Sequence, residues 1–348
     1  MNQLSNLAQQ AVNAIVRPPR NTYKLDSLPI YLKSNNGIEY IRQPINFTNP
    51  RNQKIIGSIY IESKREILDG GPCVIFMHGN ASSQSEGLFL IPNLCKYGIS
   101  VFLYDCAGCG DSGGEYVSLG YYESKDVSFL MKQLMITFNL GPFVIWGRSM
   151  GAISSIMADH SHVKGIIADS TFSTLTDLCY SIASDFGVPK VFIPPLVWWL
   201  KLNIKDIAGF DIDSVIPIEY AKLPRRAPLV LGHAVDDKFI PFIQGEQVFN
   251  AYSNKDKQFI KFDGGHNGNR PSLWYNTCFK FVFRVLGVDA INFRRSKYFG
   301  LQPITHFNSY QEMVDFAEKN GGEERALMLL TSQSKLEYEY SDGSGDEN

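Results

Sequence analysis

The sequence predicts an α/β protein with one mostly parallel central sheet, helices on both faces of that sheet, and a small helical cap. Three observations lead to this fold class. Short apolar runs of strand length recur through the middle of the chain, and segments of helical length separate them. These runs have no polar alternation, which is typical of parallel strands buried on both faces. A proline-rich stretch that contains two tryptophans then interrupts the alternation.

The chain opens with a predicted helix and a proline-rich leader, residues 1–29. Apolar residues recur at helical spacing across residues 3–16, which predicts a weakly amphipathic helix. Two placements stay open for this helix: packing against the domain, or lying on a membrane surface as a peripheral contact. The segment has no lysine or arginine before Arg17, which weakens the membrane alternative.

Residues 30–286 hold the predicted sheet and its helices. Alternation near 38–45 and 55–61, around an Asn-Pro-Arg-Asn turn, predicts an antiparallel strand pair. Mostly apolar runs then predict parallel strands, and the segments between them predict helices. The strands are expected at 73–77, 100–104, 142–147, 165–169, 227–233 and 257–262, and the helices at about 85–97, 119–138, 152–158, 242–252 and 271–286.

Two further segments complete the predicted organisation. Residues 172–224 carry five prolines and an unusually apolar run, so we expect an inserted helical cap. Within it, Trp198 and Trp199 either pack between cap and sheet or form the wall of an apolar acyl pocket. Residues 287–348 are expected to form a C-terminal extension, with a short helix at 309–319 and an acidic, disordered end.

The composition narrows the class of protein. The chain has 348 residues, 44% of them hydrophobic, and its 33 basic and 35 acidic residues nearly balance, which argues against a nucleic-acid-binding protein. The six cysteines are scattered, and Cys106 and Cys109 have no second pair beside them, so we expect no disulfide framework, no metal and no cofactor. No run of 18 apolar residues exists and the start is not a secretory signal, so we expect a cytoplasmic protein with possible membrane association only through the N-terminal helix.

One motif organises the chemistry. Gly147-Arg148-Ser149-Met150-Gly151 follows an apolar strand and precedes a helix, which is the context that a Gly-x-Ser-x-Gly nucleophile turn requires. Ser149 is the predicted nucleophile, and the alternative is a passive serine in a strand-to-helix turn. Arg148 either steers a charged substrate or, as we favour, pairs with a surface carboxylate.

A serine hydroxyl is a weak nucleophile at neutral pH, so a base and an orienting carboxylate are needed. His266 follows the last predicted core strand, and Asp236 and Asp237 follow the strand before it. Because ligands bind beyond the carboxyl ends of parallel strands, these groups can meet Ser149 in space. Neighbouring side chains in a turn point apart, so only one of the two aspartates can face His266.

The oxyanion formed during attack needs backbone amide donors. One is expected from Met150, the residue after the nucleophile, and the other from the loop after the first core strand. In that loop, His78-Gly79-Asn80-Ala81, we favour the amide of Asn80, with Ala81 as the alternative.

At these residues the sequence resembles the α/β-hydrolase superfamily, over about residues 30–286. Within it, the chain is most similar to the α/β-hydrolase-domain proteins related to protein depalmitoylases and to serine-aminopeptidase-like hydrolases. The resemblance implies that Asp237 is the acid, because the family's acid falls three residues before a hydrophobic-Pro pair, here Ile240-Pro241. The chain has no cysteine before Cys73, so it lacks the N-terminal cysteine cluster through which those depalmitoylases are lipidated. The matching stretches are 76–81, 103–113, 146–151, 236–241 and 265–267.

Together these features predict a serine hydrolase that cleaves an ester, thioester or amide of an acyl-type substrate through an acyl-enzyme, with carboxylic ester or thioester hydrolysis favoured. Its partner would be a small-molecule or acylated substrate. Two alternatives stay open: a non-catalytic ligand-binding protein on a hydrolase scaffold, and a serine-aminopeptidase-like peptidase.

Overall fold

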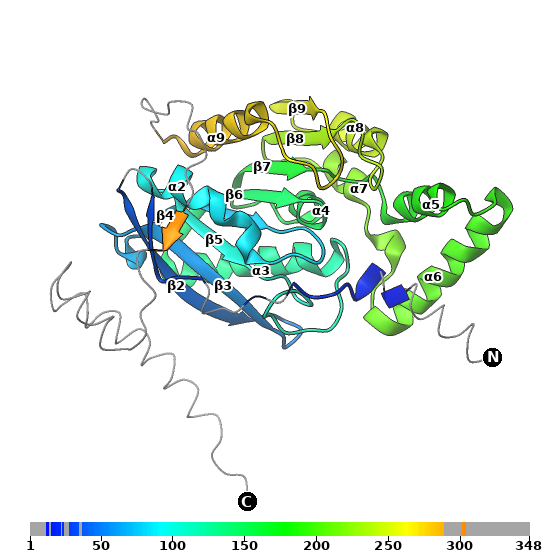
Figure 1. The fold of residues 1–348 in the computed structure, drawn as a ribbon, viewed down its shortest axis with the longest axis horizontal. Helices are drawn as coiled ribbons and strands as arrows, with labels where there is room; N and C mark the ends of the chain where they lie inside the picture. Colours follow the sequence, from blue (N-terminus) through cyan, green and yellow to red (C-terminus); the bar gives the residue numbers. More distant parts are fainter. Residues whose placement is uncertain are drawn as a thin grey trace, which may run out of the picture. The chain divides into compact units, whose positions relative to one another are not determined.

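The central feature of the computed structural model is one twisted sheet (Figure 1). The structure describes residues 12–13, 15–21, 23, 28–34, 37–288 and 301–303. In this described part, ten strands lie in the order β10-β1-β2-β3-β5-β4-β6-β7-β8-β9. The strands are β1 (Tyr31–Ser34), β2 (Glu39–Thr48), β3 (Lys54–Glu62), β4 (Gly71–Met77), β5 (Ser100–Tyr104), β6 (Leu140–Arg148), β7 (Val163–Asp169), β8 (Leu229–Ala234), β9 (Lys257–Phe262) and β10 (Leu301–Pro303).

The strand directions confirm the predicted fold class. β5, β4, β6, β7, β8 and β9 pair in parallel, while β1, β2 and β3 add an antiparallel section that joins β5. The antiparallel pair expected near 38–45 and 55–61 is β2 with β3. Strand β1 was not predicted, because four residues are too few to show a period.

Helices cover both faces of the sheet. In the described part of the chain, the helices of the sheet faces and of the segment between β7 and β8 are α2 (Ile91–Leu94), α3 (Tyr121–Phe138), α4 (Met150–Met157), α5 (Leu175–Asp185), α6 (Ile193–Ala208), α7 (Pro217–Lys222), α8 (Phe242–Ala251) and α9 (Ser272–Leu286). Alternate residues of β4 serve the two faces: Ile75 belongs to the apolar cluster shared with α3, α4 and α8, and Phe76 to the cluster shared with α2 and α9. This double burial explains why the inner parallel strands are apolar runs, whereas the edge strand β9 carries lysine and glutamine.

One predicted helix differs from the structure. Residues 85–97 form a 3₁₀ turn (Gln84–Leu90), the single turn of α2 and a second 3₁₀ turn (Cys95–Tyr97). Gly87 packs so closely on the sheet that an added Cβ would lie 2.5 Å from Leu103 and 2.8 Å from Phe76. Pro92 stands at the start of α2, where its missing N–H costs no hydrogen bond. Apolar composition alone did not reveal this tighter winding.

The segment between β7 and β8 contains α5, α6 and α7. In Figure 1, α5 and α6 stand out to the right of the sheet, whereas α7 lies against α4 and α8. Buried residues of α5 and α6 share a third apolar cluster with Ile153 of α4 and with Ile240. Trp199 is partly buried and packs against this cluster. Trp198 does not pack between cap and sheet, because 63% of it is exposed.

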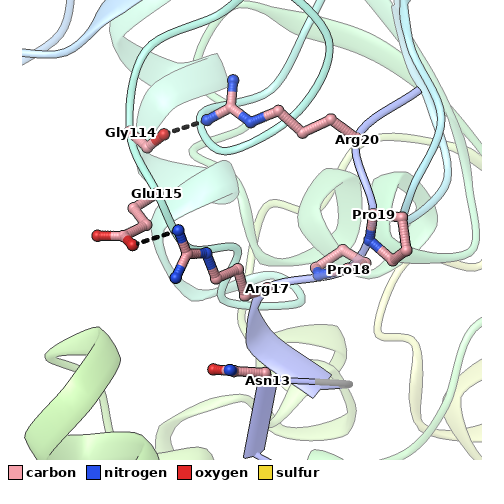
Figure 2. Close-up of a pocket in the computed structure, with 7 residues that line it drawn as sticks. All are labelled: Asn13, Arg17, Pro18, Pro19, Arg20, Gly114 and Glu115. Atoms are coloured by element: carbon pink, nitrogen blue, oxygen red, sulfur yellow. Dashed lines mark hydrogen bonds and ion pairs between the residues drawn. The ribbon is translucent and has the colours of Figure 1, made fainter. Parts of the chain in front are cut away.

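The leader lies along the loop that follows β5 (Figure 2). Arg17 pairs with Glu115 at 2.7 Å, and Arg20 donates to the carbonyl oxygens of Ser112, at 2.6 Å, and Gly114. Val12 and Val16 are fully buried in the apolar cluster of α5 and α6.

Several predictions fall on residues outside the described ranges. Of the expected helix at 3–16, residues 12, 13, 15 and 16 are described, and they are helical. The expected helix at 309–319 and the acidic end lie outside the described residues. Among the helices that are described, none is both long and apolar enough to cross a membrane.

Candidate active site

Ser149 occupies a sharp turn between β6 and α4. Its backbone has φ 51° and ψ −116°, a conformation that a residue with a side chain rarely adopts and that costs about 1–3 kcal/mol. The flanking glycines make the turn possible, because an added Cβ on Gly147 would lie 2.1 Å from the oxygen of Gly151. One on Gly151 would lie 2.0 Å from the oxygen of Met77. The sequence motif therefore corresponds to a steric requirement for two residues without side chains.

Three polar side chains from distant parts of the chain meet at this turn. His266 Nε2 lies 3.0 Å from Ser149 Oγ, and His266 Nδ1 lies 2.7 Å from Asp237 Oδ2. Ser149 follows β6, Asp237 follows β8, and His266 follows β9, so all three lie beyond the carboxyl ends of parallel strands. Ser149 is 8% exposed and the side chain of His266 11% exposed, so the hydrogen-bonded chain is close to the surface without being open to it.

The local turn distinguishes the two neighbouring aspartates. Asp237 is buried, and its Oδ1 accepts from the amides of Phe239 at 2.9 Å and Ile240 at 2.8 Å, while Asp236 is exposed. Burial acts to raise the pKa of Asp237, but the hydrogen bond and charge of His266, together with the Ile240 amide, outweigh it and hold the pKa of this carboxyl below its usual value. A carboxylate that stays ionised can orient the imidazole and stabilise its protonated form.

The two amides predicted to hold an oxyanion lie in the segments that border Ser149. An added Cβ on Gly151 would lie 2.0 Å from the oxygen of Met77, at the end of β4. One on Gly79, in the loop after β4, would lie 3.4 Å from Arg148 Nη1, so both segments pack closely beside the turn. Within the described part of the chain, neither the amide of Asn80 nor that of Met150 donates to a protein acceptor. Both are therefore available as donors, and their role stays a prediction.

Two arginines hold the loop that carries His266. Arg270 donates to the backbone oxygen of His266 at 2.9 Å and to that of Gly268 at 2.8 Å, and it pairs with Asp169 at the end of β7 at 2.8 Å. Arg148 donates to the His266 oxygen at 3.3 Å and pairs with Glu86 at 2.7 Å. The carboxylate partner expected for Arg148 is thus Glu86, which lies partly buried.

Glu86 and Arg270 were not identified from the sequence. Arg270 is 101 residues from Asp169, and Arg148 is 62 residues from Glu86. No local pattern couples positions so far apart. The weak available signal was an arginine four residues after the candidate histidine.

Other histidines have structural partners. His78 Nδ1 donates to the oxygen of Gly79 at 2.7 Å, and its Nε2 accepts from the amide of Cys106 at 3.0 Å. His233 is buried beside the acid, with Nε2 bound to the oxygen of Ile240 at 3.0 Å and 3.6 Å from Asp237 Oδ2. Burial lowers the pKa of His233, so it is neutral at physiological pH.

The Cys106–Cys109 pair has no feature of a reactive site. Both thiols are buried and free, and burial raises their pKa values, that of Cys109 to about 12. In the described ranges, no group of three or more His, Cys, Asp or Glu side chains is arranged to hold a metal ion.

Comparison with known sequences points to one superfamily. Residues 71–190, which include β4, the Asn80 loop and Ser149, match the family model described as serine aminopeptidase, S33. The uncharacterized protein YqkD of Bacillus subtilis is 26% identical over 56% of this chain and 64% of its own length. Lysophosphatidylserine lipase ABHD12 of Danio rerio is 23% identical over 55% of this chain and 51% of its own length. The chain thus spans between half and two thirds of these relatives.

Comparison with solved structures shows that the fold is shared with known enzymes. The Pyrococcus furiosus esterase Pf2001 superposes with a TM-score of 0.57 at 20% identity, covering 78% of this chain and 98% of the esterase. Acetyl xylan esterase 1 of Thermoanaerobacterium superposes with a TM-score of 0.52 at 15% identity, covering 81% of this chain and 93% of the enzyme. The chain has the α/β-hydrolase fold, and its sequence is similar to members of that superfamily. The resemblance to the α/β-hydrolase superfamily that the sequence motifs indicate is confirmed.

Proposed function

We propose that this α/β-hydrolase is a serine hydrolase that cleaves a carboxylic ester or thioester of an acyl-type substrate. The observation that carries the proposal is the hydrogen-bonded chain from Ser149 Oγ to His266 to Asp237, with distances of 3.0 and 2.7 Å. A nucleophile joined to a base, and a base joined to an orienting carboxylate, is the arrangement that acyl transfer by serine requires.

The proposed reaction has two steps. Ser149 Oγ attacks the carbonyl carbon while His266 Nε2 takes the hydroxyl proton, and Asp237 stabilises the imidazolium that forms. His266 then gives this proton to the departing alcohol or thiol, which leaves the acyl group on Ser149. A water molecule, activated by the same imidazole, attacks the acyl-enzyme and releases the acid, which restores Ser149.

The oxyanion of each tetrahedral intermediate is assigned to the amides of Asn80 and Met150. Each donor of this kind contributes about 3–4 kcal/mol to transition-state stabilisation in enzymes where it has been removed. Both amides have no competing protein acceptor among the described residues.

An acyl-type substrate is favoured by the surface beside the base. The ring of Phe239 lies 5.1 Å from that of His266 and is 51% exposed, so an apolar side chain borders the reacting groups. Among the relatives, ABHD12 is named a lysophosphatidylserine lipase, and the two solved structures compared above are named esterases. These names support an ester of an acyl group without fixing its length.

The first test is covalent labelling by a fluorophosphonate probe, with hydrolysis of short p-nitrophenyl esters measured in parallel. Ser149→Ala should abolish labelling and reduce ester hydrolysis by about a thousandfold or more. Ser155→Ala is the matched control. Ser155 is a buried serine of α4, the helix that follows Ser149, and its hydroxyl donates to the backbone oxygen of Ala152. Unlabelled wild-type protein without esterase activity would instead favour a ligand-binding protein on a hydrolase scaffold.

A peptidase is the second candidate, because residues 71–190 match a family described as serine aminopeptidase. The same triad would cleave an amide if the site bound a free amino terminus. A panel of p-nitrophenyl esters, acyl-CoA thioesters and aminoacyl p-nitroanilides separates the two. Preferred cleavage of the anilides, lost in Ser149→Ala, would assign the chain to the peptidases.

We also propose that the chain works in the cytoplasm, with its leader held on the domain and not on a membrane. Val12 and Val16 are fully buried against α5 and α6, so the apolar side chains at these two positions are already covered. Sedimentation with phospholipid vesicles tests the membrane alternative.

A further inference from the structure

We propose that the ion pair between Glu86 and Arg148 is a positioning device that fixes two loops to the nucleophile turn: the loop with the Asn80 amide and the loop with His266. This inference rests on the proposed function, since it concerns the same site. It assigns both residues a positioning role, because neither side chain touches Ser149 Oγ or the imidazole of His266 in any contact of the described chain.

Arg148 connects the turn to the histidine loop. It immediately precedes Ser149, so its backbone is part of β6 and of the turn. Its Nη2 donates to Asn267 Oδ1 at 2.7 Å and to the backbone oxygen of His266 at 3.3 Å. The guanidinium thereby links the residue before the nucleophile to the backbone of the base.

Glu86 connects the same guanidinium to the loop after β4. Its Oε1 accepts from Arg148 Nη1 at 2.7 Å, and its Oε2 accepts from the amide of Gly79 at 3.0 Å. Gly79 is the residue before Asn80. One carboxylate therefore bridges the arginine and the backbone segment that presents the predicted oxyanion donor.

Both partners are charged at neutral pH. Burial acts to raise the pKa of Glu86, but the Arg148 charge and the Gly79 amide outweigh it and hold the pKa of this carboxyl below its usual value. Burial likewise acts to lower the pKa of Arg148, and Glu86 outweighs it, so the pKa of Arg148 lies above its usual value. A charged pair gives shorter and stronger hydrogen bonds than a neutral one.

The exposure of the pair argues for positioning over stability. The side chains of Arg148 and Glu86 are 26% and 19% exposed, so the pair is partly solvated, and solvent screening keeps its contribution to the free energy of unfolding small. Yet its three anchor points lie in the three segments that must be aligned for attack. Catalysis is sensitive to misplacement of about 1 Å, which can cost about a hundredfold in rate.

The experiment compares Arg148→Met, Glu86→Gln and the double variant with wild type, using p-nitrophenyl acetate. We expect each single variant to lower kcat about 10- to 100-fold, to change KM less than about threefold, and to leave the unfolding temperature nearly unchanged. The kcat of the double variant should fall no further than that of either single variant, because each substitution breaks the same ion pair. Glu246→Gln, which breaks the exposed Lys261–Glu246 pair, is the matched control and should keep wild-type kcat.

Hydrogen–deuterium exchange tests the pair without relying on activity. In Arg148→Met and Glu86→Gln, the peptide that covers residues 263–270 should exchange faster, and in Glu246→Gln it should not. Unchanged kcat and unchanged exchange would overturn the proposal. A rise in KM with unchanged kcat would overturn the proposal, because it would mean that Arg148 binds the substrate. A loss of kcat that matches the fraction of unfolded protein would also overturn it, because the pair would then only stabilise the fold. Ester hydrolysis that does not depend on Ser149 would refute the proposed function, while the exchange result would still decide the role of the pair.

Discussion

Asp169 links Ser149 to Arg270: its backbone oxygen accepts from the Ser149 amide at 2.8 Å, and its carboxylate accepts from the Arg270 guanidinium at 2.8 and 2.9 Å. Arg270 in turn holds the backbone oxygen of His266. Both side chains of this pair are nearly inaccessible to solvent, at 4% for Asp169 and 5% for Arg270. The turn and the histidine loop are thus joined through one buried ion pair at the end of β7.

Breaking this pair should destabilise the protein. Asp169→Asn leaves the Arg270 cation buried without a full counter-charge, and removing one partner of such a pair costs about 3–5 kcal/mol in the free energy of unfolding. Urea denaturation of the variant measures the loss. Asp256→Asn breaks the exposed Arg284–Asp256 pair and should cost less than about 1 kcal/mol. Equal losses in the two variants would contradict this interpretation.

The sequence and the structure agree where a local pattern decides the conformation. Unbroken apolar runs predicted the parallel strands, and the two glycines around Ser149 predicted a turn that proves sterically exacting. The structure also brings together Ser149, Asp237 and His266, which were selected from their places after predicted strands.

The features that were not predicted depend on contacts between distant segments. Glu86 and Arg270 acquire their roles only when strands far apart in sequence lie side by side, so no periodicity marks them. The exposure of Trp198 likewise depends on how α6 rotates against α5, because its neighbour Val197 is buried and consecutive residues of a helix point about 100° apart around its axis.

The turn glycines should tolerate no side chain. An added Cβ on Gly151 would lie 2.0 Å from the oxygen of Met77 and 2.6 Å from its carbonyl carbon, so β4 and α4 would have to separate. Gly151→Ala should therefore abolish ester hydrolysis and lower the unfolding temperature by several degrees or prevent soluble expression. Gly265→Ala is the control, because no atom lies within 4 Å of an added Cβ there. A well-folded, fully active Gly151→Ala protein would show that the turn is not as close as described.

The acid can be assigned by a pair of isosteric variants. Asp237→Asn keeps the shape but loses the charge that stabilises protonated His266, so kcat should fall about a hundredfold or more. Asp236→Asn should retain most of the activity, because that side chain is exposed and Asp237 makes the contact with the imidazole. Steady-state hydrolysis of p-nitrophenyl esters measures both. The reverse order of activities would transfer the role to Asp236.

His160 should make stability depend on pH below neutrality. It is buried, its Nδ1 accepts from the Ala227 amide at 3.2 Å, and burial together with the nearby Arg226 cation lowers the pKa of His160 to about 3. The unfolded chain binds a proton at this residue near pH 6.5, whereas the folded chain stays neutral until about pH 3. Protons therefore favour the unfolded state in this window, and stability falls as pH decreases from about 6.5 towards 3, by at most about 1.4 kcal/mol per pH unit for one group.

Replacing His160 with a group that does not titrate tests this linkage. Gln offers both a donor and an acceptor, so His160→Gln should be less stable than wild type at pH 7 but lose less stability between pH 6.5 and 4. Urea midpoints measured across this pH range give the slope of stability against pH for wild type and for His160→Gln. His162→Gln is the matched control, since His162 is exposed and should leave the slope unchanged. Identical slopes in wild type and His160→Gln would mean that His160 titrates alike in the folded and unfolded chain, contrary to its buried position between α4 and β8.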